Sequence, residues 1–282
     1  MGFSAFTWII SKIADFQIYV GLITFLVWVG VFRAILLVAR SFYPAFIVTA
    51  VSVILFTPLV SLYSVVLRQG LASAIALLSL PFVLAGPLKS WRVVAIFGLV
   101  ISFHNSAVIF IVAAILVNKI PVRAIFCGWM LIVTAYILGV SGYAGKFWID
   151  LFDIDIYVLS SFDRADIDYT VGFKWKFLAL SLVPLIAIIW ATVSARISIR
   201  GLPRSTQLIL GMYFVMNSIA MMFALSTFHD RMFIWSWIFI PVAVCGIIFS
   251  VSSKRAVRRA KLQCSYSSMS LTYRSALDAW RR

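Results

Sequence analysis

The sequence predicts an all-α protein, a polytopic integral membrane helical bundle. The chain of 282 residues is 63% hydrophobic, and its mean hydropathy of +1.07 lies far above the range of soluble domains. Runs of about twenty apolar residues, the length that a helix needs to cross the hydrocarbon core, recur from Tyr19 to Val251. The alternating ten-residue strands of a membrane β-barrel are absent from the sequence.

About seven to nine membrane segments are expected, joined mostly by short linkers. The apolar runs fall near 19–39, 45–66, 70–86, 93–117, 122–142, 177–194, 206–226 and 232–251. They make residues 1–252 one transmembrane domain with a longer loop over 143–176, and they leave 253–282 as a basic tail.

The charges orient the predicted bundle. The chain carries 24 Lys and Arg against nine Asp and no Glu, a net charge of +15. Basic residues near the ends of membrane helices mark the cytoplasmic side. The tail opens with Lys254, Arg255, Arg258, Arg259 and Lys261. We therefore expect the tail in the cytoplasm, in contact with anionic lipids, and the loop 143–176 outside.

Polar residues interrupt one apolar run, where the stretch "SFHNSAVIF" covers residues 102–110. If 93–117 crosses once, seven of the basic residues before the tail lie inside and nine outside. If it dips in and returns at His104–Asn105, nine lie inside and seven outside, which agrees better with the charge rule. Each half then has eleven residues, roughly 16 Å of helix or half a bilayer. We expect this broken half-membrane hairpin, with His104 near the outer surface.

With this topology, three groups of polar residues that are costly in lipid meet at the outer face. An ionisable residue at mid-membrane depth costs about 2.5 kcal/mol or more, so such residues mark functional sites by default. The candidate catalytic residues are His104, His229 and Asp230. The candidate substrate-binding residues are Arg68, Gln69, Asn105, Ser106, Arg231 and, in the external loop, Arg164.

Structural roles compete with these functional ones. A lone histidine in a membrane helix can hydrogen-bond a neighbouring backbone carbonyl, and Arg231 beside Asp230 is compatible with a local ion pair that anchors a span. The acidic residues of the external loop are typical of a solvated face. The tryptophans that flank external span ends are expected to be interfacial anchors; they are Trp148, Trp175, Trp235 and Trp237.

The sequence gives no support to several other classes of site. Cys127, Cys245 and Cys264 have the spacing of neither a disulfide framework nor a metal site. There is no P-loop, no dinucleotide fingerprint and no RNA-binding motif, so the net charge indicates orientation and anionic lipid and not nucleic acid. The first fifteen residues lack the basic n-region of a cleavable signal peptide. We expect no metal and no cofactor.

Two long stretches carry a recognisable order of residues. "SLYSVVLRQGLASAIALLSL" has an Arg-Gln followed by small residues, and "LKSWRVVAIFGLVISFHNSAVIFIVAAILV" has a Lys-bearing loop that leads into a Phe-His-x-Ser stretch. This order resembles the EpsG family of exopolysaccharide polymerases, which are Wzy-like, over roughly residues 60–118. The later "FHDRMFIW" looks like the family's arginine before an aromatic-rich final span. Family members usually begin with further spans, so this chain is expected to lack the family's N-terminal part.

The resemblance implies a fold like that of GT-C-like polysaccharide polymerases and a glycosyltransferase reaction without metal or nucleotide. Such an enzyme joins oligosaccharide repeat units carried on undecaprenyl diphosphate, at the outer face of the bacterial inner membrane. Arginine forks suit the leaving diphosphate. Neutral His104 would accept the proton of the attacking sugar hydroxyl or orient that sugar. A flippase and a chain-length regulator of the same pathway are further expected partners.

Two other functions remain open on the residues alone. A transporter or flippase of lipid-linked sugars would also use a cationic cavity at membrane depth. A membrane O-acyltransferase would also depend on histidine and arginine, and it would need a route for its acyl donor. Arginines that extend through the mid-membrane indicate transport, whereas in this sequence they stop at the outer half.

Overall fold

The structure is a computed structural model that describes residues 2–12, 15–39, 41–64, 66–85, 90–143, 147, 172–225 and 229–254. Within these residues every regular element is a helix, which confirms the all-α prediction. The helices that are long and apolar enough to cross a membrane are Phe16–Ala39, Leu67–Leu84, Trp175–Ala195, Arg204–Met222 and His229–Lys254. Shorter apolar helices accompany them, so the chain is a multi-pass membrane bundle.

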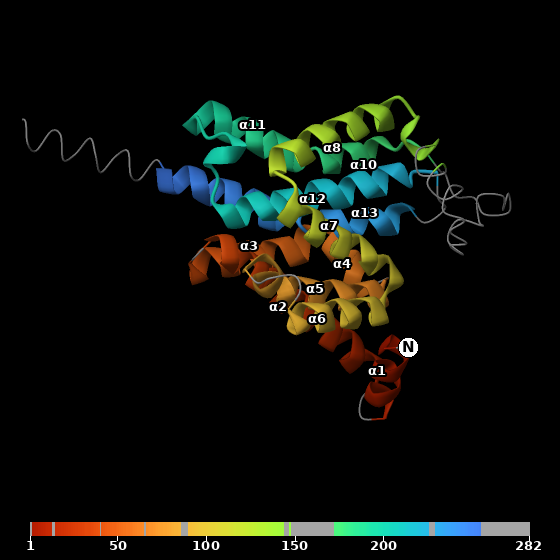
Figure 1. The fold of residues 1–282 in the computed structure, drawn as a ribbon. Coiled ribbons are helices and arrows are strands. Elements are labelled where there is room, and N and C mark those ends of the chain that lie inside the picture. The colour runs from red at the N-terminus through yellow and green to blue at the C-terminus, as the bar shows by residue number, and fades with distance from the viewer. Residues whose placement is uncertain are drawn as a thin grey trace, which may run out of the picture.

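The helices form two groups with α7 (Val108–Lys119) between them (Figure 1). The first group contains α2 (Phe16–Ala39), α3 (Phe42–Leu55), α4 (Thr57–Ser64), α5 (Leu67–Ala85) and α6 (Trp91–Phe103). The second contains α8 (Val122–Ile137), α10 (Trp175–Ser181), α11 (Val183–Ala195), α12 (Arg204–Met222) and α13 (His229–Trp237), whose helical course continues to Lys254. The shorter elements are α1 (Gly2–Ser11), which packs on α6, η1 (Asn105–Ala107) and η3 (Ile199–Gly201).

Apolar side chains at helical spacing explain how each group packs. In α2, Ile23, Val27 and Val31 recur every fourth residue and are fully buried, and α2 makes its most extensive contact with α5. The opposite faces of the helices carry exposed large apolar side chains, such as Phe25 and Ile47. A helix that is apolar on all sides is stable at the rim of a bundle when lipid surrounds it.

The broken hairpin predicted for 93–117 is present. α6 ends at Phe103, the turn contains His104 and η1, and α7 follows from Val108. The rings of Phe97 and Phe110 lie 6.3 Å apart between centroids. In one continuous helix these residues would be separated by about 20 Å along the axis, so the chain reverses at the turn.

One predicted span has a different form. The apolar run 45–66 does not form one continuous helix, because it divides into α3 and α4 at Phe56. The break is at Phe56, which takes an extended conformation with φ −87° and ψ 99°. Pro58 follows in the first turn of α4, where the missing N–H of a proline costs no helical hydrogen bond, so it favours the start of a new helix there.

A paired polar network joins the helices of the second group. Asn217 of α12 donates to Ser181 Oγ at 2.9 Å and to Ser236 Oγ at 3.1 Å, and its Oδ1 accepts from Trp129 Nε1 at 2.9 Å. All four side chains are buried. Hydrogen bonds of this kind stabilise helix contacts in an apolar solvent.

The interfacial-anchor prediction holds for only some of the tryptophans. Trp175 is 70% exposed, as an anchor at a span end should be. Trp235 and Trp237 are 0% and 7% exposed, so their prediction as anchors is wrong. Both indole N–H groups donate to serine hydroxyls inside the bundle, and this pairing makes burial of a tryptophan favourable. Trp148 lies outside the described residues.

Candidate functional site

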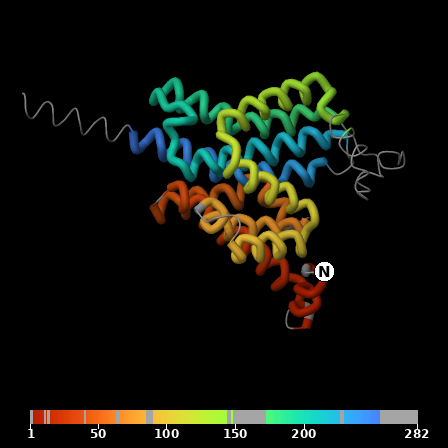
Figure 2. The backbone as a smooth tube through the Cα atoms, viewed as in Figure 1, coloured from red at the N-terminus to blue at the C-terminus, as the bar shows by residue number. Residues whose placement is uncertain are grey.

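The three polar groups predicted from the sequence meet at one end of the bundle. The tube in Figure 2 shows the chain running back and forth along one direction, so the starts of α5 and α13 and the α6–α7 turn share an end. Two hydrogen bonds connect these elements: Gln69 Nε2 donates to the Arg231 carbonyl at 2.7 Å, and Trp235 Nε1 donates to Ser106 Oγ at 2.8 Å. We call this the site end; it lies where the two groups of helices adjoin.

Close packing of α4 on α5 fixes the position of Arg68 and Gln69. A Cβ on Gly70 would overlap the carbonyl of Leu62, so only glycine allows α4 to lie this close to the first turn of α5. Gln69 is fully buried, and its Oε1 has no hydrogen-bond partner in the part of the chain that the structure describes. Arg68 is exposed, with its guanidinium 4.8 Å from the ring centre of Phe3 in α1.

The α6–α7 turn holds His104 through its own backbone. His104 is extended, with φ −154° and ψ 119°, and its ring Nδ1 accepts from the backbone N–H of Ser106 at 3.3 Å. Ser106 Oγ lies 2.7 Å from the same nitrogen. The half-buried imidazole is therefore attached to the turn by Nδ1, which leaves Nε2 as its other polar atom.

Positive charge dominates among the described residues of the site end. The pKa of His104, a turn residue, is lowered from 6.5 to about 4. Burial is the main cause, and the positive charges of the exposed side chains of Arg231 and Arg68 add to it. Three helices, α5, α7 with η1, and α13, also begin here. Helix N-termini carry unpaired N–H groups and partial positive charge, so they favour an anion in the same place as the arginines do.

Two candidate catalytic residues occupy different surroundings. His229 is fully buried between aromatic rings, 5.2 Å from Phe177 and 6.2 Å from Phe233, which is the setting of a packing residue. Asp230 is half-buried, and its Oδ1 has no hydrogen-bond partner among the described residues. Burial lowers the pKa of Lys174, and the nearby charge of Asp230 opposes that shift. The carboxylate of Asp230 thus lies near Lys174, with a buried oxygen that accepts no hydrogen bond from the described residues.

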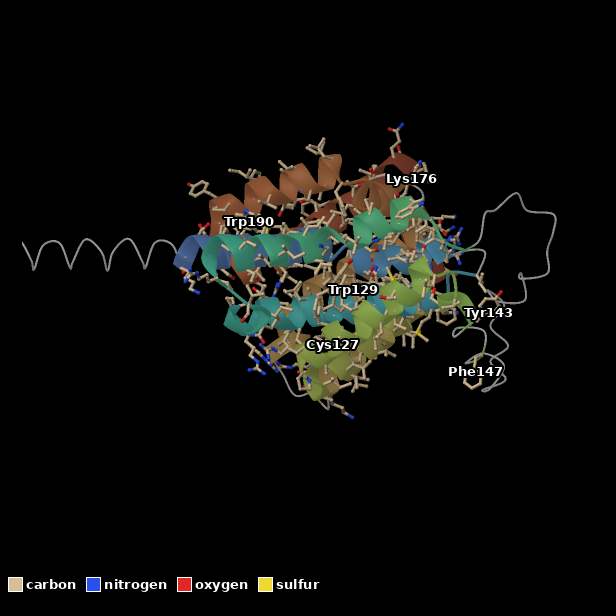
Figure 3. All side chains as sticks on the ribbon, turned by 90° about the horizontal axis from the view of Figure 1, so that it is seen from above. Cys127, Trp129, Tyr143, Phe147, Lys176 and Trp190 are labelled. Carbon is tan, nitrogen blue, oxygen red and sulfur yellow. The ribbon has the colours of Figure 1, made fainter. Side chains whose placement is uncertain are left out.

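The remaining predicted residues divide between the turn and the undescribed loop. Asn105 is exposed at the turn, directly before Ser106. Arg164 lies outside the described residues, as do the basic residues that follow Lys254. Tyr143 and Lys176, on either side of that loop, lie at the same end of the bundle, with Trp190 nearer the other (Figure 3).

Sequence reasoning missed two residues of the site. Phe3 lies under Arg68, and Trp235 binds Ser106. A signal for Trp235 was present, because it follows Arg231 by four residues and therefore lies on the same face of α13. No signal in the sequence connects Phe3 with Arg68.

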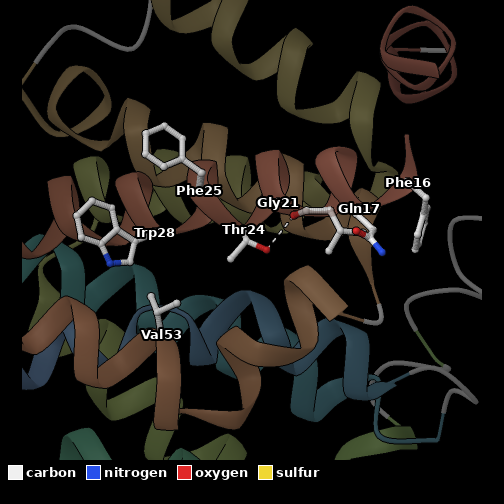
Figure 4. Close-up of a pocket in the computed structure, with 8 residues that line it drawn as sticks. Phe16, Gln17, Gly21, Thr24, Phe25, Trp28 and Val53 are labelled. Atoms are coloured by element: carbon white, nitrogen blue, oxygen red, sulfur yellow. Dashed lines mark hydrogen bonds between the residues drawn. The ribbon is translucent and has the colours of Figure 1, made fainter. Parts of the chain in front are cut away.

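Two large apolar grooves lie beside the site end. An apolar groove of about 1010 Å³ lies between α7, α8 and α12. A second, of about 620 Å³, follows α2 from Phe16 past Gly21 to Trp28, with Val53 of α3 on its other side (Figure 4). This groove is open because α3 ends at Leu55 and because no neighbouring atom lies within 4 Å of the position that a Cβ on residue 21 would take.

Among the described residues no group of three or more His, Cys, Asp or Glu side chains is placed to hold a metal ion, and the expectation of a metal-free site stays a prediction. The model of the EpsG family matches residues 1–275 of the chain. No curated protein and no solved structure matches it. The matched range contains every residue of the site end.

Proposed function

The chain belongs to the EpsG family and is a multi-pass membrane protein of polysaccharide biosynthesis, and on this premise we propose that it polymerises lipid-linked repeat units. The substrates are oligosaccharides on undecaprenyl diphosphate, and the reaction takes place at the outer face of the bacterial inner membrane. The site end then faces outward and the C-terminal tail lies in the cytoplasm.

One observation carries this proposal: two arginines and three helix N-termini converge at one end of the bundle. In the reaction, the oxygen of the acceptor hydroxyl bonds to the anomeric carbon of the donor as the bond from that carbon to the diphosphate breaks. Negative charge on the diphosphate grows during this step. Fixed positive groups aimed at growing charge are the main source of catalysis in reactions of this kind. Arg68 and Arg231 therefore hold the diphosphate.

The neighbouring polar groups serve the sugar. Asp230, whose buried Oδ1 has no hydrogen-bond partner among the described residues, takes the proton of the acceptor hydroxyl. His104 is less suited to be that base, because Nδ1 is occupied and the two arginines disfavour a charged imidazole. We assign it instead to donate a hydrogen bond from Nε2, the orienting role that the sequence left open. The buried Oε1 of Gln69 can accept from a sugar hydroxyl.

The groove along α2 is suited to the polyisoprenoid chain of the substrate. A series of ring contacts connects it with the diphosphate site: Phe16, at the mouth of the groove, lies 6.4 Å from Tyr19, and Tyr19 lies 6.5 Å from Phe3, which supports Arg68. A lipid diphosphate bound by Arg68 thus has an apolar path beside its headgroup. The rest of the groove is mainly apolar, with the Thr24 hydroxyl bonded to the carbonyl of Val20 at 2.8 Å.

Analysis of lipid-linked glycans after deletion of the gene tests the proposal. A polymerase defect accumulates single repeat units on undecaprenyl diphosphate at the outer leaflet, and expression of the intact chain restores longer products. Repeat units that fail to reach the outer leaflet would identify a flippase instead. Conversion of single units to longer chains by the purified protein in vesicles, without nucleotide or added metal, separates the enzyme from a scaffold and from an acyltransferase.

A further inference from the structure

The geometry points to Trp235 and Ser106 as positioning residues that keep the proton of His104 on Nε2 and direct that N–H into the site. The role of this N–H group in catalysis rests on the proposed function. The hydrogen-bond arrangement that carries it is independent of the reaction.

The donors and acceptors around Ser106 allow one consistent arrangement. An indole N–H can only donate, so the 2.8 Å contact makes Ser106 Oγ the acceptor from Trp235. The backbone N–H of Ser106 is directed at His104 Nδ1, and a ring nitrogen that accepts such a bond carries no hydrogen. The single hydroxyl hydrogen of Ser106 then goes to the same Nδ1, 2.7 Å away. A neutral imidazole with an unprotonated Nδ1 has its hydrogen on Nε2.

Burial makes this arrangement costly to change. Trp235 is fully buried, and its ring centre lies 6.5 Å from that of Phe110 in α7. A buried polar group that loses its partner costs about 1–3 kcal/mol, so the indole N–H remains on the Ser106 hydroxyl. Because Trp235 and Arg231 lie one turn apart on α13, the helix that supplies the arginine also fixes the histidine.

As a consequence, the neutral His104 ring offers a hydrogen-bond donor beside the two cationic side chains, Arg68 and Arg231. An Nε2–H group donates to a sugar hydroxyl or a diphosphate oxygen without adding a third positive charge. If the hydrogen moved to Nδ1, the imidazole would present a lone pair to the site. That arrangement repels an anion, so the tautomer matters for binding of a diphosphate.

The test is nuclear magnetic resonance of protein labelled with ¹⁵N and ¹³C in histidine, in lipid nanodiscs. The chain has two histidines, so one His104→Gln spectrum assigns both. We expect wild-type His104 to show the hydrogen on Nε2. Trp235→Phe, which removes the indole N–H together with part of the ring, should increase the population with the hydrogen on Nδ1. Ser106→Ala should increase it less, because the backbone N–H of residue 106 still points at Nδ1. Ser106→Thr keeps the hydroxyl and should restore the wild-type signals.

Trp237→Phe is the matched control, because it also removes a buried indole donor from the same helix, one that bonds to Ser181 Oγ at 3.3 Å. It should leave the His104 spectrum unchanged. An unaltered tautomer in both Trp235→Phe and Ser106→Ala overturns the inference, as does an equal change in Trp237→Phe.

Polymer synthesis by the same preparations gives the second readout. Loss of one oriented hydrogen bond of about 1.4 kcal/mol corresponds to an approximately ten-fold lower rate in Trp235→Phe and Ser106→Ala, with recovery in Ser106→Thr. If these variants show a changed His104 tautomer but synthesise polymer at the wild-type rate, the tautomer has no role in catalysis. If wild-type protein itself makes no polymer, the proposed function fails, and the spectra still decide whether Trp235 sets the tautomer.

Discussion

Replacement of Arg68 is the most direct test of the diphosphate site. A bidentate arginine makes two charge-assisted hydrogen bonds to phosphate oxygens, each worth about 1.5–3 kcal/mol. Arg68→Ala removes both, so the rate of polymerisation should fall about 10²–10⁴-fold. Arg68→Lys keeps the charge but loses the fork, and with one bond lost the rate should fall about 10–10²-fold.

The structure indicates that these variants fold. Arg68 is exposed, and its guanidinium packs on the Phe3 ring at 4.8 Å. A cation–π contact at an exposed position contributes about 0.5–1 kcal/mol. The assay is the rate at which single lipid-linked units become longer chains in reconstituted vesicles, per molecule of protein that remains monodisperse in detergent.

Arg33→Ala is the matched control. Arg33 is also an exposed helical arginine beside a phenylalanine ring, 5.8 Å from the centre of Phe82, but it lies in α2 far along the helix from the site end. Its replacement should leave the rate unchanged. A wild-type rate in Arg68→Ala, or an equal loss in Arg33→Ala, would refute the assignment of Arg68 to the diphosphate.

Four further changes test other parts of the structure. In a cysteine-free background, Asn105→Cys should react with an impermeant thiol reagent on intact cells and Arg92→Cys should not; external labelling at position 92 contradicts the hairpin. Asp230→Asn should lower the rate of polymerisation about 10²–10⁴-fold, as expected for loss of a base, without a change in folding; an unchanged rate excludes Asp230 from that role. Gly21→Phe fills the α2 groove and should lower the rate, whereas Gly98→Phe, at another glycine with nothing within 4 Å of a built Cβ, should not; equal rates argue against a lipid chain in this groove. Asn217→Leu removes three interhelical hydrogen bonds of about 0.6 kcal/mol each and should lower the free energy of unfolding by about 2 kcal/mol, measured with denaturant; an unchanged midpoint means that the network does not stabilise the bundle.

The sequence was sufficient to predict which polar residues meet at the site end. In an apolar solvent each polar side chain inside a span is costly, so Gln69, His104 and Arg231 are conspicuous against their surroundings. The hairpin followed from the same cost together with the charge rule. The succession of spans then predicted that the starts of α5 and α13 and the α6–α7 turn lie at one end.

Tertiary contacts decided what the sequence did not predict. A tryptophan beside a span end has an apolar ring and one donor, which suits both the membrane interface and a buried serine. Trp235 and Trp237 are buried because serines of η1 and α10 lie within reach of their N–H groups, and no pattern within α13 reveals those partners. In the same way, the position of His229 between Phe177 and Phe233 depends on how α10 packs against α13.

The charge balance of the site end indicates what kind of ligand completes it. Arg68 and Arg231 bring two positive charges to a place where three helices also begin, and Asp230 is the acidic residue that the structure describes beside them. A diphosphate would carry negative charge to these cationic groups and would accept from several donors at once. The bonds from Gln69 to Arg231 and from Trp235 to Ser106 hold these donors in place before the ligand arrives, which reduces the reorganisation that binding and reaction require.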